Sequence, residues 1–299
     1  MTNQNPTHET ALAFRALHIP GRPLVLPNAW DTASARLIEE AGAAAVATTS
    51  AGLAWDLGTA DGDRLDRDRA LGAVARVAAA VRVPVSADIE SGYAKDAAGV
   101  GDTIRAVLAA GAVGVNIEDA LYGGEGDGGE GDGGEGDGGE DAGDGGRGPL
   151  RPVAEQAERI AAARAAADAA GVPLFINARI DTVLRGAGGV EETLERAAAF
   201  LAAGADGIFV PGAVDPGTVK SLVAGVEGPL NVLAGPGAPS VAELAALGVA
   251  RISTGSSIAQ AAHAVVRRAA RELLSAGTYD SLTGGLDYVE LNTLLGGAR

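Results

Sequence analysis

The sequence alternates between short β-rich runs and longer helical patterns, and this alternation restricts the folds open to it. Most gaps between the β-rich runs place apolar residues three or four positions apart, as at Val190, Leu194, Ala197 and Leu201, a spacing typical of amphipathic helices. Eight strand–helix units within about 240 residues predict a single α/β domain, a (β/α)8 TIM barrel, with a doubly wound open sheet as the alternative. The strand-like runs are Leu24–Trp30, Ala44–Ser50, Val83–Glu90, Gly114–Asp119, Pro173–Asp181, Gly207–Gly212, Pro229–Gly235 and Arg251–Ser256.

Two further helical patterns follow the eighth run, at Ser257–Ala276 and Leu286–Leu295. We therefore expect one barrel domain over residues 1–299, with residues 257–299 as extra C-terminal helices. The second pattern contains more apolar residues than a free terminus needs. This tail is expected to pack either on its own barrel or on a neighbouring subunit.

An acidic glycine-rich segment, residues 123–148, follows the fourth strand-like run. Its core, Gly124–Gly138, is three copies of Gly-Glu-Gly-Asp-Gly without an apolar residue. Such a segment has no apolar surface to bury, so we expect a disordered insert in the loop after strand four. A cation-binding coil is the alternative, although calcium-binding repeats of similar composition have an aliphatic position that is missing here.

Charge and composition argue against several classes of partner. The net charge is −16, and the segment 123–148 contributes nine acidic residues against one arginine, which leaves −8 elsewhere. Nucleic acid is not expected, because phosphate binding needs clustered lysine and arginine. A membrane is not expected either, since no apolar run approaches the roughly 20 residues that span a bilayer. The start of the chain lacks a signal-peptide pattern and there is no cysteine, so we expect a cytoplasmic protein.

Carboxylates gather where the predicted strands end. Asp88 and Glu90 end the third run, Glu118 ends the fourth, and Arg179 with Asp181 ends the fifth. The carboxyl ends of parallel strands share one rim of a barrel, and acids that meet there repel one another unless a cation or a proton intervenes. With no cysteine, and with the three histidines far from these positions, oxygen ligands favour a hard ion such as Mg²⁺, with Mn²⁺ as a substitute.

Six short motifs occur in order along the predicted strands: Asn28-Ala29-Trp30-Asp31, Thr49-Ser50-Ala51-Gly52, Leu57-Gly58-x-x-Asp61, Ala87-Asp88-Ile89-Glu90-x-Gly92-Tyr93, Ile117-Glu118-Asp119 and Ala178-Arg179-x-Asp181. In these motifs the chain resembles the isocitrate lyase / phosphoenolpyruvate mutase superfamily, and within it the carboxyvinyl-carboxyphosphonate phosphorylmutase-like and oxaloacetate decarboxylase-like branch. The resemblance implies a Mg²⁺-dependent barrel that forms or breaks C–C or C–P bonds beside the carbonyl of a small 2-oxo acid. It also implies a homo-oligomer, a dimer or tetramer, whose C-terminal helices swap between subunits.

The resemblance assigns a metal role to four of these acids. Asp88 would bind the ion directly, while Asp61, Glu90 and Glu118 would hold its water molecules. Asp61 and Glu118 would also be catalytic residues.

The substrate carboxylate would be bound by Arg179 and by a turn at the end of the second strand, through a hydroxyl and backbone N–H groups. Arg179 would also be catalytic, because an arginine beside Mg²⁺ stabilises the enolate left by bond cleavage next to a 2-oxo acid. The turn comprises Thr49, Ser50, Ala51 and Gly52.

Three segments depart from the family's pattern, and each concerns substrate choice or proton transfer. The loop after strand four begins Ala120-Leu121-Tyr122 and lacks the usual lysine or cysteine, the sixth strand ends in Val210-Pro211-Gly212, and the seventh ends in Ala234–Pro239.

We therefore predict a Mg²⁺-dependent lyase that cleaves a C–C bond, in the simplest case by decarboxylation, in a small 2-oxo or 2-hydroxy dicarboxylate. The alternatives are C–P chemistry, as in phosphonopyruvate hydrolase or phosphoenolpyruvate mutase, and a non-catalytic barrel that binds a 2-oxo acid.

Several residues also have a purely structural interpretation. The rim acids could pair with basic residues, as Arg179 could with Glu118 or Asp181, and Asp31 suits the N-cap of the following helix. Tyr93 and Tyr122 are expected to face solvent. The ends of the last two strands, Gly235–Gly237 and Ser253–Ser256, could instead form the phosphate site that many barrels have there.

Overall fold

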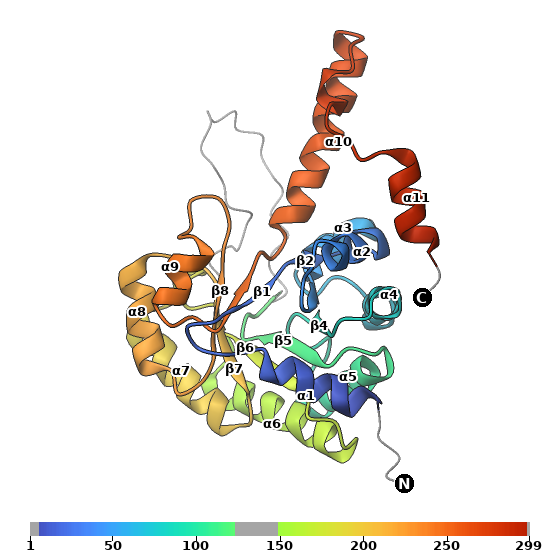
Figure 1. Ribbon diagram of the computed structural model, residues 1–299. Helices are drawn as coiled ribbons and strands as arrows, with labels where there is room; N and C mark the ends of the chain where they lie inside the picture. The colour runs from blue at the N-terminus through green and yellow to red at the C-terminus, as the bar shows by residue number, and fades with distance from the viewer. Residues whose placement is uncertain (1–5, 123–148, 298–299) are drawn as a thin grey trace.

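A computed structural model describes residues 6–122 and 149–297. In this part of the chain nine strands, all parallel, form a ring in the order β1-β9-β8-β7-β6-β5-β4-β3-β2 (Figure 1). They are β1 (Leu24–Leu26), β2 (Asn28–Ala29), β3 (Val46–Thr48), β4 (Val85–Asp88), β5 (Gly114–Glu118), β6 (Phe175–Arg179), β7 (Gly207–Val210), β8 (Leu230–Leu233) and β9 (Arg251–Ser253).

The ring closes through the first predicted run, which the structure divides into β1 and β2. Pro27 separates the two pieces, and proline has no backbone N–H to donate to a ladder. β1 pairs with β9 and β2 pairs with β3, so the two pieces join the ends of the sheet. The predicted barrel is confirmed, and the open doubly wound sheet is wrong.

A helix follows each strand position, as the helical periodicity predicts, and the helices before α10 cover the outside of the ring. Asp31 forms the N-cap of α2: its Oδ1 accepts a hydrogen bond from the Ser34 N–H at 2.6 Å, which confirms the capping interpretation. The helices are α1 (Pro6–Ala16), α2 (Thr32–Glu40), α3 (Ser50–Asp56), α4 (Arg67–Ala80), α5 (Ala97–Ala109), α6 (Val153–Ala169), α7 (Val190–Ala202), α8 (Pro216–Gly225), α9 (Val241–Ala246), α10 (Ser257–Ser275), the 3-10 turn η1 (Asp280–Leu282) and α11 (Tyr288–Gly296).

Helix α1 closes the end of the barrel opposite the strand carboxyl ends. Phe14 is fully buried there, and a Cβ on Gly114 would stand 2.5 Å from its ring. Glycine at the start of β5 therefore lets the aromatic ring plug the barrel. The catalytic chemistry of such a fold belongs at the opposite end.

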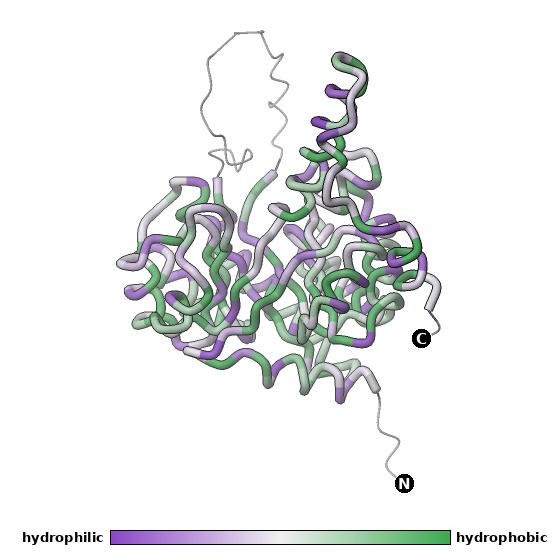
Figure 2. The backbone as a smooth tube through the Cα atoms, turned by 45° about the horizontal axis from the view of Figure 1, so that its top comes forward, coloured by the Kyte–Doolittle hydropathy of each residue, from purple (hydrophilic) through white to green (hydrophobic). Residues whose placement is uncertain are grey.

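The last barrel helix, α10, leaves the barrel instead of covering it. It projects from the molecule in Figure 1, and its projecting part mixes hydrophobic and hydrophilic residues in Figure 2. Only Ala259 of this helix is buried, while Val266 and Leu274 are 68% and 86% exposed. The chain then returns, and α11 meets α2, where Arg36 Nη2 donates to the Leu294 carbonyl at 2.8 Å.

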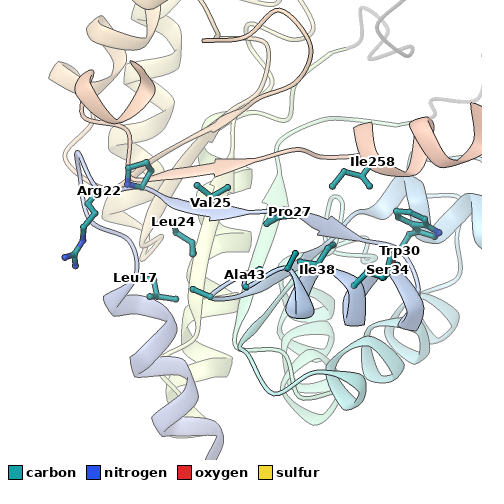
Figure 3. A pocket seen from close by; sticks show the side chains of 15 residues that line it. Leu17, Arg22, Leu24, Val25, Pro27, Trp30, Ser34, Ile38, Ala43 and Ile258 are labelled. Carbon is teal, nitrogen blue, oxygen red and sulfur yellow. The ribbon is translucent and has the colours of Figure 1, made fainter. Parts of the chain in front are cut away.

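A wide apolar groove lies where a helix following β9 would cover a conventional barrel (Figure 3). It has a volume of about 930 Å³ and leaves Val25 of β1 41% exposed. Other residues that line it include Leu17, Leu24, Pro27, Trp30, Ile38 and Ile258. The groove is on the side of the barrel, away from the carboxylates.

The insert expected at residues 123–148 lies outside the described residues, but the chain on either side of it is fixed. Ala120 and Leu150 form an antiparallel bridge, and the Leu121 N–H donates to the Pro149 carbonyl at 3.1 Å. The insert therefore starts and ends at neighbouring points of the barrel rim.

Within the described residues, no helix is long and apolar enough to cross a membrane. The cytoplasmic location remains a prediction.

His18 makes stability dependent on pH. Its ring is buried, stacks on Phe175 at a centroid distance of 3.8 Å, and has an Nε2 atom without a hydrogen-bond partner. Burial, reinforced by the positive charge of Arg251, lowers the pKa of His18 to about 3. The unfolded chain therefore binds one more proton than the folded chain between about pH 3 and 6.5, so the free energy of unfolding falls as the pH drops below 6.5.

We predict that His18→Phe removes this contribution, which has a slope of at most about 1.4 kcal/mol per pH unit. Urea unfolding of both proteins at several pH values between 4 and 7 measures the difference in slope. Equal slopes for the two proteins would contradict the assignment.

Candidate active site

A cavity of about 360 Å³ opens at the carboxyl ends of the strands, a volume that suits a small ligand. Six of the residues selected from the sequence line it, and they come from the segment that follows β3 and from the ends of β4 and β6. They are Thr49, Ser50, Ala51, Asp61, Asp88 and Arg179. Glu90, Glu118 and Gly52 do not line it, and each lies behind a residue that does.

Asp88 ends β4 and presents its carboxylate to the cavity. Its backbone N–H donates to Thr48 Oγ1 at 2.9 Å, and its Oδ2 accepts the Ser50 N–H at 3.2 Å. These two contacts join the ends of β3 and β4. They orient the carboxylate and leave part of it accessible.

Glu90 supports the loop that carries Asp61. Its Oε2 accepts the N–H groups of Gly62, at 3.1 Å, and of Asp63, and its Oε1 accepts the Tyr93 hydroxyl at 3.1 Å. Glu90 is 2% exposed, and burial raises its pKa to about 8. Glu90 therefore holds the Asp61 loop, and its contact with a metal-bound water stays a prediction.

The expectation that Tyr93 faces solvent is wrong, because its hydroxyl is turned inward to Glu90. Its backbone has a φ of 50°, in the left-handed region that favours glycine, as do Glu90 and Asp63 with φ of 50° and 56°. Three strained residues in one hydrogen-bonded cluster show that the surrounding contacts dictate this backbone. A sequence pattern carries no signal for such a conformation.

Arg179 lies between two buried carboxylates. Its Nη1 is 2.6 Å from Glu118 Oε2, and its Nε and Nη2 are 2.6 and 3.0 Å from the two oxygens of Asp181. The structural ion pairs anticipated for Arg179 are therefore present. A guanidinium has five N–H donors, so these three bonds leave two N–H groups for a ligand in the cavity.

Asp119 secures the second of those carboxylates. Its Oδ1 accepts the Asp181 N–H at 2.9 Å, and its Oδ2 pairs with Arg196 at 3.0 Å. Burial raises the pKa of Asp119 to about 6. Asp119 acts by fixing the turn after β6 and does not reach the cavity.

The acidic side of the cavity accumulates negative charge, as a cation site requires. Burial and the nearby charge of Asp88 raise the pKa of Asp61, and burial raises the pKa of Glu118 well above its usual range. Glu118 Oε1 is buried without a hydrogen-bond partner among the described residues. An unpaired carboxylate oxygen beside Asp88 and Asp61 fits the hydrogen bond that a metal-bound water would donate.

Within residues 6–122 and 149–297, no three His, Asp or Glu side chains are close enough together to hold a metal ion by themselves. The oxygen donors do fit a hard ion that binds one carboxylate directly and keeps several waters, which is common for Mg²⁺.

The phosphate interpretation of the last two strand ends is disfavoured. Asn28 Oδ1 already accepts the N–H groups of Thr254 and Gly255, at 3.0 and 2.9 Å. These backbone donors are the ones that a phosphate would need. Gly237 does not line the cavity.

Several cavity residues had no individual role in the sequence prediction: Asn28, Asn116, Tyr122, Arg185 and Gln260. Tyr122 is half-buried and lies under the Arg185 guanidinium, with 4.8 Å between its ring centroid and Arg185 Cζ. The expectation of a solvent-facing Tyr122 is wrong. The sequence offered one indication that Arg185 reaches the cavity. It lies six residues after Arg179, in a turn that follows a strand.

The sequence matches the phosphoenolpyruvate phosphomutase family over residues 14–274. The chain belongs to this family. It is therefore a member of the isocitrate lyase / phosphoenolpyruvate mutase superfamily, and it is an enzyme, because the superfamily comprises lyases, mutases and hydrolases acting at C–C and C–P bonds.

The relatives of this chain with named activities catalyse different reactions. An uncharacterized Mycobacterium tuberculosis protein is 34% identical over 95% of this chain and 96% of its own. The phosphoenolpyruvate phosphomutase of Streptomyces hygroscopicus is 30% identical over 84% of this chain and 75% of its own, and the 2-methylisocitrate lyase of Salmonella typhimurium is 29% identical over 68% and 62%.

Solved structures agree with this placement. A Burkholderia cenocepacia protein, provisionally described as a lyase/mutase, is 37% identical and superposes with a TM-score of 0.83 over 96% of this chain and 95% of its own. Phosphonopyruvate hydrolase with oxalate and Mg²⁺ is 25% identical, with a TM-score of 0.77 over 96% and 95%. The comparisons thus establish the family and leave the reaction of this chain open.

Gly52 has a packing role behind the cavity. A Cβ at this position would stand 2.7 Å from Thr49 Cγ2 and from Trp30 Cβ. We predict that Gly52→Ala lowers the free energy of unfolding by about 1–3 kcal/mol through overpacking.

Gly72 provides the matched control, because it lies inside α4 with nothing within 4 Å of an added Cβ. Gly72→Ala should raise the free energy of unfolding by about 0.5–1 kcal/mol, since alanine has the higher helix propensity. Chemical denaturation measures both variants, and equal effects of the two substitutions would refute the close contact at Gly52.

Proposed function

We propose that this enzyme is a Mg²⁺-dependent lyase that cleaves a C–C bond in a small 2-oxo or 2-hydroxy dicarboxylate through an enolate. The supporting observation is that Asp88 and the two uncommitted N–H groups of Arg179 face the same small cavity. The acid side suits a divalent cation and the arginine suits an oxyanion, so the site matches an enolate with its adjacent carboxylate.

Mg²⁺ would be held by Asp88 directly and through waters by Asp61 and Glu118, and it would polarise the carbonyl oxygen on which negative charge develops. Arg179 would bind the oxyanion from the opposite side. Ser50 and Ala51 at the start of α3 would receive the substrate carboxylate. In a 2-oxo substrate the electron pair of the cleaved C–C bond would pass to the carbonyl as an enolate, which then takes a proton at carbon. In a 2-hydroxy substrate the hydroxyl would lose its proton and become the carbonyl, and the electron pair would pass to the carbon beside a carboxylate of the other fragment, which then takes a proton.

Loss of carbon dioxide is the simplest form of this reaction, because it needs no acid to protonate the leaving fragment. C–P cleavage is the second candidate, and a named relative with phosphomutase activity and a similar structure of a phosphonopyruvate hydrolase favour it. Both reactions pass through the same enolate, so the metal and Arg179 would serve either one.

A substrate panel distinguishes the candidates. The protein is incubated with Mg²⁺ and oxaloacetate, isocitrate, 2-methylisocitrate, phosphonopyruvate or phosphoenolpyruvate, and pyruvate and phosphate are measured. C–C cleavage supports the lyase. Phosphate release with no C–C cleavage of any substrate would replace it with C–P chemistry.

Asp88→Asn keeps the shape of the side chain and removes its charge. We predict that it lowers Mg²⁺-dependent turnover about a thousand-fold, since the metal supplies several kcal/mol of charge stabilisation, while circular dichroism and melting temperature stay close to wild type. Activity that persists in this variant, or in wild type with excess EDTA, would exclude the metal role.

We also propose that the enzyme is a homo-oligomer in which α10 of one copy fills the lateral groove of another. The groove is mostly apolar and no helix within residues 6–122 and 149–297 covers it, and α10 carries exposed Val265, Val266 and Leu273. The helix leaves its barrel at Ile258, itself a groove residue, so a neighbouring copy can exchange helices about this point (Figure 3).

We predict a wild-type mass by light scattering of at least twice the 29.5 kDa of one chain. Val25→Asp in the groove and Val266→Asp on α10 should each shift the mass toward the monomer, because each would bury an unpaired charge. Arg267→Asp on the same helix is the control and should leave the mass unchanged. A monomeric wild type would reject the assembly.

A further inference from the structure

The side chain of Arg185 faces the cavity and makes no hydrogen bond with any described residue. It is only 6% exposed, and its Nε atom is buried without a hydrogen-bond partner in this part of the chain. Buried donors in native proteins are usually satisfied, and leaving them unsatisfied costs free energy. An arginine in this condition at the wall of an enzyme cavity needs an explanation.

Two other buried arginines also have unpaired nitrogens, Nε and Nη1 in each, but both donate at least one hydrogen bond from Nη2. Arg159 donates to the carbonyls of Ser91 and Ala94 at 2.6 and 2.9 Å, and Arg251 donates to Asn116 Oδ1 at 3.1 Å. Neither of them lines the cavity. Arg185 differs because its side chain lines the cavity and donates no hydrogen bond to a described residue.

The nearest carboxylate does not satisfy the donors of Arg185. Its Nε is 3.6 Å from Asp181 Oδ2, outside hydrogen-bond distance, and both oxygens of Asp181 already accept hydrogen bonds from Arg179. Asp181 is therefore an ion-pair partner of Arg185 that leaves its N–H groups without an acceptor.

The guanidinium is nevertheless held in place. It lies over the ring of Tyr122, with 4.8 Å between Cζ and the ring centroid, a cation–π contact. Its own backbone N–H donates to the Asp181 carbonyl at 2.9 Å, within the turn that follows β6. A positioned guanidinium with free donors is preorganised for a planar or tetrahedral oxyanion.

We propose that Arg185 is a specificity-determining residue that binds the second anionic group of the substrate, the carboxylate or phosphonate that pyruvate lacks. This inference rests on the proposed function, in which Asp88 and Arg179 engage the 2-oxo acid end. Arg185 then selects substrates with an anion at the other end.

The inference narrows the reaction. A cation that binds a carboxylate stabilises it in the ground state, and this opposes its loss as neutral carbon dioxide. Arg185 therefore disfavours decarboxylation of the group that it holds. It favours substrates whose second anionic group leaves as an anion, either as the carboxylate of a second fragment after C–C cleavage or as phosphate after C–P cleavage by water.

Two stable probes test the role by calorimetry in the presence of Mg²⁺. Oxalate resembles the pyruvate enolate and has no group for Arg185, whereas 3-sulfopyruvate carries an additional sulfonate and is inert to both cleavages. We expect Arg185→Gln to weaken 3-sulfopyruvate at least ten-fold and oxalate less than two-fold. Arg185→Lys should recover part of the loss, because it restores the charge without the planar donors.

Arg105→Gln on α5 is the matched charge control. Arg105 is 60% exposed and pairs with Asp102 on the surface, so both affinities should stay at wild-type values. Melting temperatures verify that all variants are folded. Steady-state kinetics with 2-methylisocitrate and phosphonopyruvate then show whether Arg185 binds a carboxylate or a phosphonate. The KM of whichever compound is a substrate should rise in Arg185→Gln.

The outcomes separate this inference from the proposed function. Equal losses for both probes in Arg185→Gln, or no loss for 3-sulfopyruvate, would overturn the role of Arg185 while Mg²⁺-dependent oxalate binding still supports the site. If the wild type binds neither probe with Mg²⁺, the proposed function fails and the inference fails with it.

Discussion

The buried ion-pair cluster of Arg179 with Glu118 and Asp181 joins the barrel to the chemistry of the site. Two carboxylates deprived of water require a cation between them, because an unpaired buried charge is strongly destabilising. Arg179 satisfies both, at 2.6 Å from each, and so connects the end of β5 to the turn after β6. Its remaining donors have one direction open to them, the cavity.

Charge balance also explains the arrangement of the carboxylates on the acidic side of the cavity. Glu90 is turned inward to organise the loop that brings Asp61 beside Asp88, and Glu118 keeps one oxygen unpaired. The consequence is a concentration of carboxylates that folding alone does not balance. A divalent cation would balance it, and the remaining N–H donors of Arg179 and Arg185 would then be available to an anionic ligand.

The sequence predicted the barrel and part of the cavity, for reasons that the structure makes clear. Parallel strands are read from local composition, and their shared direction brings Asp88, Glu118 and Arg179 to one rim. What the sequence missed depends on side-chain direction and on tertiary contacts. Glu90 lies two residues past β4 with a left-handed backbone, the inward position of Tyr93 and Tyr122 follows from loop geometry, and no local pattern shows that α10 leaves the barrel.

Direct measurement of metal binding is the clearest test of the proposed metal site. Mn²⁺ binding can be followed by electron paramagnetic resonance together with water-proton relaxation, first alone and then with oxalate. A site built on one carboxylate should bind a single ion per chain with several exchangeable waters, lose some of those waters to oxalate, and disappear in Asp88→Asn. A fully protein-coordinated ion, or Mn²⁺ binding that does not depend on Asp88, would contradict this description.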